Sequence, residues 1–285
     1  MEEQQNAGLS PSMECHAKPP RVSIIMAVNR IDGYLQAAID SILNQTFSNF
    51  ELLVIADSGC PGLSEQVLQC AGGDRRIRIV TARIGGGVAF SRNLGIVEAL
   101  GEYVAVMDGD DVSRPDRLRR QAEFLDRNPD IDVVGCRVQM IDQTSKNLAR
   151  GFRYFETDAQ IRKVLPYRVP IPHPAVMFRK RALIRLQGYK YGHSGEDYEM
   201  FIRMARDRTI RFYNLNEVLL EYRRHGVQLT HASQLQQQYA EISGFLFTEF
   251  LLTHSPKYLL GMLILHPWVR RTRLAWRKLS QGREL

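Results

Sequence analysis

The sequence predicts an α/β fold in which helices flank a central, mostly parallel sheet. Short apolar runs rich in Val and Ile alternate with longer segments of helical periodicity in the first half of the chain. These helical segments are long enough to connect parallel strands. Hydrophobic residues make up 44% of the 285 residues, which suits one large α/β domain or a domain with an appendage.

The first half supplies the expected parallel strands and the helices between them. The strands are expected at residues 22–27, 50–56, 77–80 and 103–107. Helices are expected at residues 34–44, after the first strand, and at residues 88–100, before the fourth. Because helices of this length separate the strands, we expect right-handed crossovers.

The second half continues with elements of both kinds. Pro115 suits the first turn of a helix that runs to about residue 128, and an apolar run follows at 131–140. A strand is expected at 173–178, with a helix after it through residue 186. Residues 196–204 have helical periodicity and an acidic first turn, which favours a helix start.

The ends of the chain and its cysteines indicate a cytoplasmic protein. Residues 1–20 are polar, without an apolar core after a basic start, so we expect a disordered leader and no signal peptide. No run reaches the roughly 18 apolar residues of a membrane-spanning helix. The four cysteines form no CxxC pair or metal-finger spacing, which is typical of a reduced compartment.

Polar residues follow three of the expected strands directly. Asn29, Asp57 and Asp108 come just after the first, second and fourth strands. Ligands of open α/β sheets bind beyond the carboxyl ends of the strands, so these residues fit the edge of a pocket. The polarity that is common to all loops explains the same pattern, and position alone does not decide between the two interpretations.

The segment Asp108-Gly109-Asp110-Asp111 places three carboxylates on four residues. Carboxylates packed this closely repel one another unless a cation or hydrogen-bond donors compensate. Mg²⁺ or Mn²⁺ suits such oxygen ligands and would neutralise a diphosphate leaving group. The alternative is a solvated acidic turn that caps the helix near Pro115.

A glycine-rich stretch precedes this cluster. Residues 85–87 are all glycine, which permits close backbone approach, and Arg92 follows as a candidate ligand of a base, ribose or phosphate. A flexible loop with a surface arginine explains the same residues. The GxGxxG fingerprint of dinucleotide-binding folds is absent, so neither NAD nor FAD is expected.

Several short segments, considered together, identify a family. They are residues 22–29, 45–51, 91–96, 101–111, 115–118, 173–179, 195–199 and 220–225. In their order and spacing the chain resembles the inverting glycosyltransferases of family 2, which have the GT-A fold. The resemblance covers residues 21–230. It implies a GT-A domain there that moves a sugar from a nucleotide-diphosphate donor, with UDP as the leading choice, to a hydroxyl acceptor in polysaccharide or glycolipid biosynthesis.

The resemblance also implies which residues hold the donor. The nucleotide-sugar-binding positions are Ala27, Asn29, Asp57, Arg92 and Asp108. Among them, Asp57 would bind the base, Asp108 would contact the ribose or lie near the metal, and Arg92 would help to hold the nucleotide.

The catalytic and metal-binding positions follow from the same resemblance. Asp110 would be the main ligand of Mg²⁺ or Mn²⁺, and His225 would approach the diphosphate or the metal. Asp197 would be the general base that deprotonates the acceptor hydroxyl, with Glu196 as the second candidate. A carboxylate at a rigid helix start suits this role, although the helix dipole favours an acidic first turn in any helix.

The chain departs from the family pattern at two strand ends. Ala27-Val28-Asn29 stands where the family often has Pro-x-Tyr-Asn. After the second strand the family often has Asp-Asp-Gly-Ser-x-Asp, whereas this chain keeps Asp57 but has Ala56 and Pro61 at two of the other acidic positions. These departures make the choice of base less secure.

Residues 231–285 are expected to form a helical, basic, amphipathic region. One helical face would carry Leu265, Trp268, Val269, Thr272, Trp276 and Leu279. The opposite side carries Arg270, Arg273, Arg277 and Lys278, so much of the net charge of +7 belongs to the tail. Such a helix either lies in an anionic membrane interface, at the inner face of the cell membrane and near a lipid-linked acceptor, or packs on the domain with its basic face solvated.

Other functions account for the sequence less well. A nucleic-acid partner is not expected, because no groove of stacking aromatic residues can be identified. A sugar-phosphate nucleotidyltransferase would have a glycine-rich, basic phosphate signature near the amino terminus, which this chain lacks. The departures near Ala27 and Ala56 leave an inactive nucleotide-sugar-binding scaffold as an alternative, but Asp110 and Asp197 are both retained.

Overall fold

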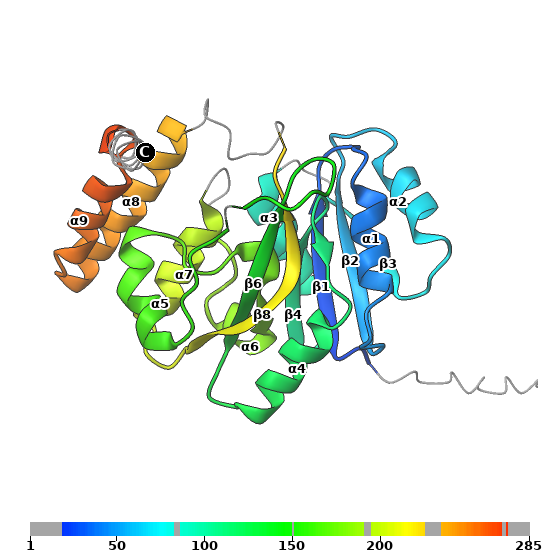
Figure 1. Cartoon of the computed structure of the whole chain (residues 1–285), viewed down its shortest axis with the longest axis horizontal. Coiled ribbons are helices and arrows are strands. Elements are labelled where there is room, and N and C mark those ends of the chain that lie inside the picture. Colours follow the sequence, from blue (N-terminus) through cyan, green and yellow to red (C-terminus); the bar gives the residue numbers. More distant parts are fainter. Residues whose placement is uncertain are drawn as a thin grey trace, which may run out of the picture.

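The computed structural model describes residues 19–82, 86–149, 151–190, 195–225, 235–269 and 272. Its strands are β1 (Val22–Val28), β2 (Phe50–Asp57), β3 (Ile77–Ala82), β4 (Tyr103–Asp108), β5 (Val112–Ser113), β6 (Val133–Ile141), β7 (Met177–Arg179) and β8 (Phe212–Arg223). They form one eight-stranded sheet in the order β3-β2-β1-β4-β7-β6-β8-β5. Helices flank this sheet, which confirms the predicted α/β fold class (Figure 1).

The parallel half of the sheet fixes where a ligand can bind. Strands β3, β2, β1 and β4 are neighbours and all run parallel. The chain moves outward from β1 to β2 and β3 and then returns to the other side of β1 to form β4. In such sheets the ligand crevice lies beyond the carboxyl ends of the strands at this reversal. Ala27 is paired with Asp108 there, so the ends of β1 and β4 lie side by side.

The other half of the sheet is mixed. Strands β4 and β7, β6 and β7, and β5 and β8 pair antiparallel, whereas β6 and β8 pair parallel. The prediction of a mostly parallel sheet therefore describes the first four strands, and three of the seven pairings among the described residues are antiparallel. The register between β6 and β8 shifts around Arg137, which bends both strands across the sheet.

Helices cover both faces of the sheet and build two cores. The helices of the first core are α1 (Leu35–Leu43), α2 (Leu63–Ala71) and α4 (Arg117–Arg127). Those of the second are α3 (Gly87–Glu98), α5 (Asp158–Val164), α6 (Lys180–Arg185) and α7 (Glu196–Arg206). Strand β1 divides its apolar residues between them, because Ile24 faces the first core and Ile25 the second. This explains why its run is apolar apart from Ser23.

Two further helices pack onto the second core. They are α8 (Leu235–Thr253) and α9 (Lys257–Leu265), which lie side by side at the end of the molecule away from β3 (Figure 1). Leu246 of α8 and Tyr258 of α9 are buried in the core. A Cβ atom on Gly261 would come within 2.1 Å of the Pro166 carbonyl oxygen, so only glycine allows α9 this close. None of the helices described here has the length and apolarity that crossing a bilayer requires.

Some local predictions were wrong. The strand expected at 173–178 begins as a short 3-10 helix, η2 (His173–Ala175), because Pro174 cannot donate a ladder hydrogen bond, and only β7 is a strand. The chain leaves α9 at His266, whose ψ is 131°, before Pro267. Leu265 and Trp268 therefore do not share one helix. Most of the basic tail, and the leader apart from residues 19 and 20, lie outside the described residues.

Candidate active site

The acidic cluster lies at the carboxyl end of β4, at the reversal of strand order. Asp108 ends β4, and Asp110 and Asp111 occupy the turn that leads to β5. One oxygen from each of the three carboxylates lies within 4.8 Å of the others. The cluster does not cap a helix, because β5 and residues 114–116 separate it from α4, whose N-cap residue is Asp116. The interpretation as an acidic cap is therefore wrong.

Asp111 is the buried member of the cluster, with 1% of its surface exposed. Its Oδ1 accepts a hydrogen bond from the Arg223 backbone N–H at 2.8 Å. Its Oδ2 is buried and has no hydrogen-bond partner among the described atoms. Desolvation, together with the charges of Asp108 and Asp110, raises the pKa of Asp111 well above its usual range. Binding of either a proton or a cation would therefore stabilise this carboxylate.

Arg223 holds the turn in place from the end of β8. Its Nε donates to the backbone carbonyl of Asp110 at 2.8 Å, in addition to the contact between its backbone and Asp111. Its guanidinium lies over the Tyr34 ring, 4.6 Å from the ring centroid. Arg223 therefore ties the turn to β8, and Tyr34, the residue before α1, packs on Arg223.

The structure brings Asp110 and His225 together across 115 residues of sequence. His225 Nε2 lies 2.8 Å from Asp110 Oδ2, and an Arg30 nitrogen lies 3.7 Å from the same oxygen. The His225 ring packs on the Tyr34 ring, with centroids 5.0 Å apart. The side chains of Asp110 and His225 are 12% and 5% exposed, so this pair forms a largely enclosed wall of the site.

Arg92 lies inside the site and not on the surface. The residue is 5% exposed, so the interpretation as a surface arginine is wrong. Its guanidinium donates to Asp108 Oδ1 at 3.1 Å and to Glu196 Oε1 at 2.5 Å. It also lies 5.7 Å from the centre of the Tyr189 ring. One buried cation from α3 thus connects the end of β4 with the start of α7.

Asp197 stands in the first turn of α7, with its Oδ1 accepting from the Tyr198 backbone N–H at 2.7 Å. Desolvation and the adjacent Glu196 raise the pKa of Asp197 to about 7, while Arg92 opposes this shift. The helix begins after Gly195, whose φ of +81° is open to glycine but strained for other residues. Asp197 is therefore a carboxylate that binds a proton near neutral pH.

The remaining predicted donor residues line the same edge of the sheet. Asn29 is exposed directly after β1, and Ala27 is half-buried beside the end of β4. Asp57 ends β2, and its Oδ1 accepts from the Gly59 backbone N–H at 2.8 Å in a tight turn. The structure thus brings the ends of β1, β2 and β4 together with the acidic cluster.

The sequence did not indicate the residues that hold Tyr189 beside Arg92. His173 Nε2 lies 2.8 Å from the Tyr189 hydroxyl, and desolvation and the nearby Arg92 charge hold the pKa of His173 well below its usual value. Asn93 fixes Tyr189 by donating to its backbone carbonyl and accepting from its backbone N–H, at 2.7 and 2.8 Å. The only signal in the sequence was the place of His173 and Asn93 in the matching segments.

Comparison with known proteins agrees with this geometry. Residues 23–186 match the family described as Glycosyl transferase family 2. The chain is 36% identical over 232 residues to the O-antigen biosynthesis glycosyltransferase WbnJ of Escherichia coli, covering 81% of this chain and 89% of WbnJ. It is 30% identical over 208 residues to the glycosyltransferase EpsE of Bacillus subtilis, covering 72% of this chain and 73% of EpsE.

Two solved structures share the fold at low sequence identity. TarS 1–349 of S. aureus, in complex with UDP-GlcNAc, superposes with a TM-score of 0.65 at 17% identity, covering 81% of this chain and 66% of TarS 1–349. The mannosyltransferase PcManGT from Pyrobaculum calidifontis, in complex with GDP-Man and Mn²⁺, has a TM-score of 0.61 at 17% identity, covering 92% and 75%. These likenesses confirm the GT-A fold. With the family match over more than half of its length, the chain is a glycosyltransferase and belongs to glycosyl transferase family 2.

Proposed function

We propose that this enzyme is a metal-dependent, inverting glycosyltransferase that moves a sugar from a UDP-linked donor to a hydroxyl of a glycan or lipid-linked acceptor in surface polysaccharide biosynthesis. The observation that carries the proposal is the arrangement around Arg92. Its buried guanidinium pairs with Asp108 of the acidic cluster and with Glu196, next to the candidate base Asp197. The likeness to WbnJ, an O-antigen biosynthesis enzyme, supports the pathway.

The donor nucleotide would lie across the ends of β1, β2 and β4. In this pose Asp57 binds the base, Asn29 and Ala27 line the ribose side, and Asp108 meets the ribose or the metal. TarS in complex with UDP-GlcNAc supports a UDP donor, whereas PcManGT in complex with GDP-Man shows that the same fold accepts another base. Arg92 would help to hold the nucleotide indirectly, because its hydrogen bond to Asp108 fixes the position of that carboxylate.

The cluster suits Mg²⁺ or Mn²⁺. All the clustered ligand atoms are carboxylate oxygens, and the unpartnered Asp111 Oδ2 is a buried site of negative charge that a cation would neutralise. Asp110 would be the main ligand, with Asp111 as a second oxygen donor and His225 beside it. When bound, the ion would neutralise charge on the diphosphate leaving group.

Asp197 is the proposed general base. Its Oδ1 is held by the Tyr198 N–H, which leaves Oδ2 to accept the proton of the acceptor hydroxyl as that oxygen attacks the anomeric carbon. A single in-line displacement of this kind inverts the anomeric configuration. Glu196 is less suited, because its carboxylate is already paired with Arg92.

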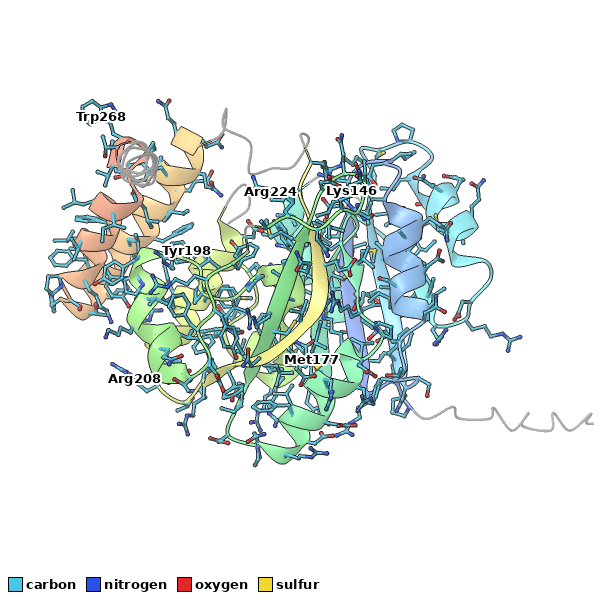
Figure 2. All side chains as sticks on the ribbon, in the orientation of Figure 1. Lys146, Met177, Tyr198, Arg208, Arg224 and Trp268 are labelled. Atoms are coloured by element: carbon cyan, nitrogen blue, oxygen red, sulfur yellow. The ribbon has the colours of Figure 1, made fainter. Side chains whose placement is uncertain are left out.

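We also propose that the carboxyl-terminal region meets an anionic membrane at the inner face of the cell membrane. Helices α8 and α9 leave several large apolar side chains exposed, namely Phe247, Leu251, Leu252, Leu260 and Leu263. Trp268 is 72% exposed and lies at the end of the molecule away from the sheet (Figure 2). The basic residues from Arg270 onward supply the charge that attracts anionic lipid. A membrane position would bring the site to a lipid-linked acceptor.

A donor screen tests the proposed activity. Nucleotide sugars are incubated with Mn²⁺ or Mg²⁺ and a broad acceptor panel, and release of the nucleoside diphosphate is measured. Asp197→Asn should bind donor but lose turnover by about a hundredfold or more, the size of general-base catalysis. Asp110→Asn should lose metal-dependent turnover.

Controls separate these effects from trivial ones. Asp130→Asn changes a carboxylate with 56% side-chain exposure and should behave as wild type. Pyrophosphate release from a nucleoside triphosphate would instead indicate a nucleotidyltransferase. Donor binding without turnover across the whole acceptor panel would indicate a scaffold, and full turnover in Asp197→Asn would remove Asp197 from the mechanism.

A further inference from the structure

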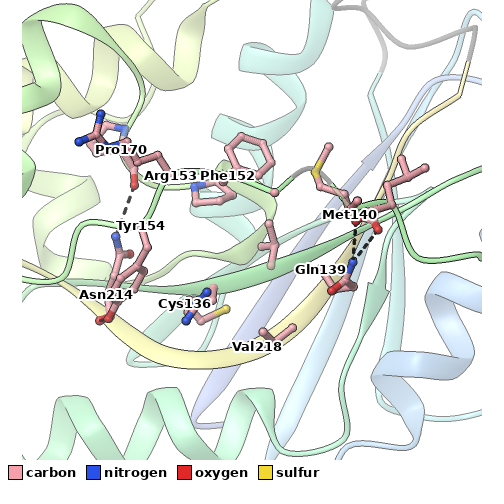
Figure 3. A pocket seen from close by; sticks show the side chains of 15 residues that line it. Cys136, Gln139, Met140, Phe152, Arg153, Tyr154, Pro170, Asn214 and Val218 are labelled. Carbon is pink, nitrogen blue, oxygen red and sulfur yellow. Dashed lines mark hydrogen bonds between the residues drawn. The ribbon is translucent and has the colours of Figure 1, made fainter. Parts of the chain in front are cut away.

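A cavity of about 320 Å³ lies over β6 and β8, away from the predicted donor residues. Residues 148–149 and 151–154 cross above the two strands and form one wall (Figure 3). The side chains that give the cavity its chemistry are Arg137, Gln139, Phe152, Arg153, Tyr154 and Asn214. Its volume is at the lower end of the roughly 300–1,000 Å³ typical of small-molecule sites.

Two guanidinium groups line this cavity without carboxylate partners. Neither Arg137 nor Arg153 has a carboxylate within ion-pair distance in the described part of the chain. Arg137 donates to the amide oxygen of Asn216 at 3.1 Å and lies 5.4 Å from the Tyr154 ring centroid. Arg153 lies 5.6 Å from the Phe155 ring centroid. Both residues are exposed, so their charges remain available to an anion, and each guanidinium lies near an aromatic ring.

The rest of the lining suits a sugar. Phe152 and Tyr154 offer aromatic rings against which the C–H face of a sugar ring packs. The Gln139 amide nitrogen donates to the Met140 and Leu148 carbonyls, which leaves its amide oxygen to a ligand. The Tyr154 hydroxyl donates to the Asn214 backbone carbonyl at 2.6 Å, which fixes the position of the Tyr154 ring. This mixture of aromatic, amide and guanidinium groups fits an anionic saccharide better than a purely apolar ligand.

Tyr222 connects the cavity with the acidic cluster. The Phe152 ring meets the Tyr222 ring edge-on, with centroids 5.3 Å apart, and Met140 of the cavity wall is paired with Tyr222 across β6 and β8. The next residue of β8, Arg223, donates its backbone N–H to Asp111 of the acidic cluster. Burial and the charges of that cluster raise the pKa of the Tyr222 hydroxyl. Tyr222 therefore lies between the cavity wall and the acidic cluster.

The order of the strands assigns a side to the cavity. The predicted donor residues lie at the ends of β2, β1 and β4, whereas the cavity lies on β6 and β8, beyond β7. A ligand in the cavity would thus lie in the half of the sheet that does not carry the predicted nucleotide-binding residues of β1 and β2. An in-line displacement places the acceptor opposite the leaving diphosphate, and this half of the sheet fits that requirement.

We propose that this cavity binds an oxyanion-bearing sugar unit of the acceptor, a carboxylated sugar or a sugar phosphate, with Arg137 and Arg153 as its ligands. This inference rests on the proposed function, which makes the occupant of the cavity an acceptor. It narrows the acceptor to an anionic glycan. Guanidinium groups bind carboxylate and phosphate through two parallel hydrogen bonds, so both anions suit the same pair.

Direct binding to the full chain tests the cavity without any turnover. The probes are octyl glucuronide, octyl glucoside and glucose 1-phosphate, and calorimetry or ligand-observed NMR measures the dissociation constants. Either the glucuronide or the phosphate should bind about tenfold or more tightly than the neutral glucoside, the ratio expected for one charge-assisted hydrogen bond. Whichever anion binds more tightly identifies the source of the charge.

Matched variants decide which residues carry the effect. Arg153→Ala and Arg137→Ala should each weaken the anionic probe by about tenfold and leave the neutral probe unchanged, and Arg153→Lys should recover part of the loss. Arg127→Ala removes an arginine with 77% side-chain exposure outside the cavity and should change nothing. Equal binding of charged and neutral probes, or unchanged binding in both folded alanine variants, would overturn the proposal.

A second measurement separates this inference from the proposed function. With an active donor and a charged acceptor, Arg153→Ala should raise the KM of the acceptor more than it lowers kcat, and the dissociation constant of UDP should stay as in wild type. Wild-type protein that releases no nucleotide with any donor would count against the proposed function. The binding experiment would still decide whether the cavity selects an anion.

Discussion

The buried oxygen Asp111 Oδ2 is the atom of this site at which a negative charge is most unfavourable. It has no hydrogen-bond partner among the described atoms, and the pKa of Asp111 is raised well above its usual range by desolvation and by its acidic neighbours. Asp111→Asn keeps an oxygen to accept from the Arg223 N–H and removes the buried charge. The metal-free variant should therefore be more stable than wild type, by roughly 1–3 kcal/mol.

Thermal unfolding in EDTA and in Mn²⁺ measures this effect. The Mn²⁺-induced rise in Tm should shrink in Asp111→Asn, because a ligand oxygen has been replaced. Asp130→Asn serves as the exposed control. A lower Tm in EDTA, combined with a full response to Mn²⁺, would show that Asp111 is structural and not a ligand.

The pH dependence of turnover should report on Asp197. A base must be deprotonated, so kcat/KM should rise with pH through about 7, the pKa to which desolvation and Glu196 raise Asp197, and level off above it. Because the folded-state pKa lies above the unfolded value, protonated Asp197 favours folding. This contribution to stability is complete below about pH 4 and is lost as the pH rises through about 7. Asp197→Asn should remove it, which Tm measured against pH for both proteins will show.

Arg92 should influence the pH at which kcat/KM rises. Its charge opposes the rise in the pKa of Asp197, so Arg92→Gln should move the acid limb of any residual activity to higher pH. The same change leaves Asp108 and Glu196 without their shared cation and should cost about 3–5 kcal/mol of stability. Arg92→Lys keeps the charge but not the two-armed geometry, so its pH limb should stay near that of wild type while turnover falls. An unshifted limb in Arg92→Gln would contradict this account.

At the scale of elements, the start of α7 depends on Gly195. The φ of +81° strains any other residue, and a Cβ atom there would lie 3.0 Å from Ile242 of α8. Gly195→Ala should therefore destabilise the fold by about 1–3 kcal/mol and displace Asp197. Gly244→Ala in the interior of α8 has open space and should stabilise by up to about 1 kcal/mol. Denaturant unfolding and turnover of the two variants provide the comparison.

The elements also show what sequence patterns can and cannot predict. Strands β1, β2 and β4 were predictable because both of their faces are buried and their runs are mostly apolar. Strand β3 lies at the edge of the sheet and is mostly half-buried, so only the short run at 77–80 indicated it. Strand β8 was missed because its run includes polar residues such as Asn214, Asn216 and Glu217, and its pairing with β6 shifts register. Helix α5 is short, and its capping box between Thr157 and Gln160 was the signal that could have identified it.

The candidate site likewise has features that local sequence predicts and features that only tertiary packing produces. Asp108, Asp110 and Asp111 are adjacent in sequence, so local spacing was enough to predict their cluster. The Arg92–Glu196 pair spans 104 residues, and its burial follows from the packing of α3 against the sheet, which no local pattern encodes. The cavity is lined by β6, β8, residues 148–149 and residues 151–154, and these segments come together only in the folded chain.

For the whole molecule, the apolar surface of α8 and α9 should direct membrane binding. Leu251→Glu with Leu263→Glu places charges on side chains that are 54% and 65% exposed, so folding should persist while binding to anionic vesicles falls several-fold. A vesicle-sedimentation assay measures it, with Val97→Glu, at a 77% exposed position on α3, as the control. Deleting the residues after Pro256 should also lower binding, although this removes the buried Tyr258 and so requires proof of folding. Unchanged sedimentation of the folded variants would refute the membrane proposal.

The close contact between Gly261 and the Pro166 carbonyl has a consequence for geometry at a bilayer. Pro166 belongs to the short 3-10 helix η1 (Leu165–Tyr167), and the Leu165 carbonyl accepts from the Tyr198 hydroxyl at 2.5 Å. One turn of chain therefore links α9 to the residue beside Asp197. If α8 and α9 hold the enzyme on a lipid surface, the distance between that surface and Asp197 is fixed. Only acceptors whose reacting hydroxyl lies at that distance from their lipid anchor would then reach the base.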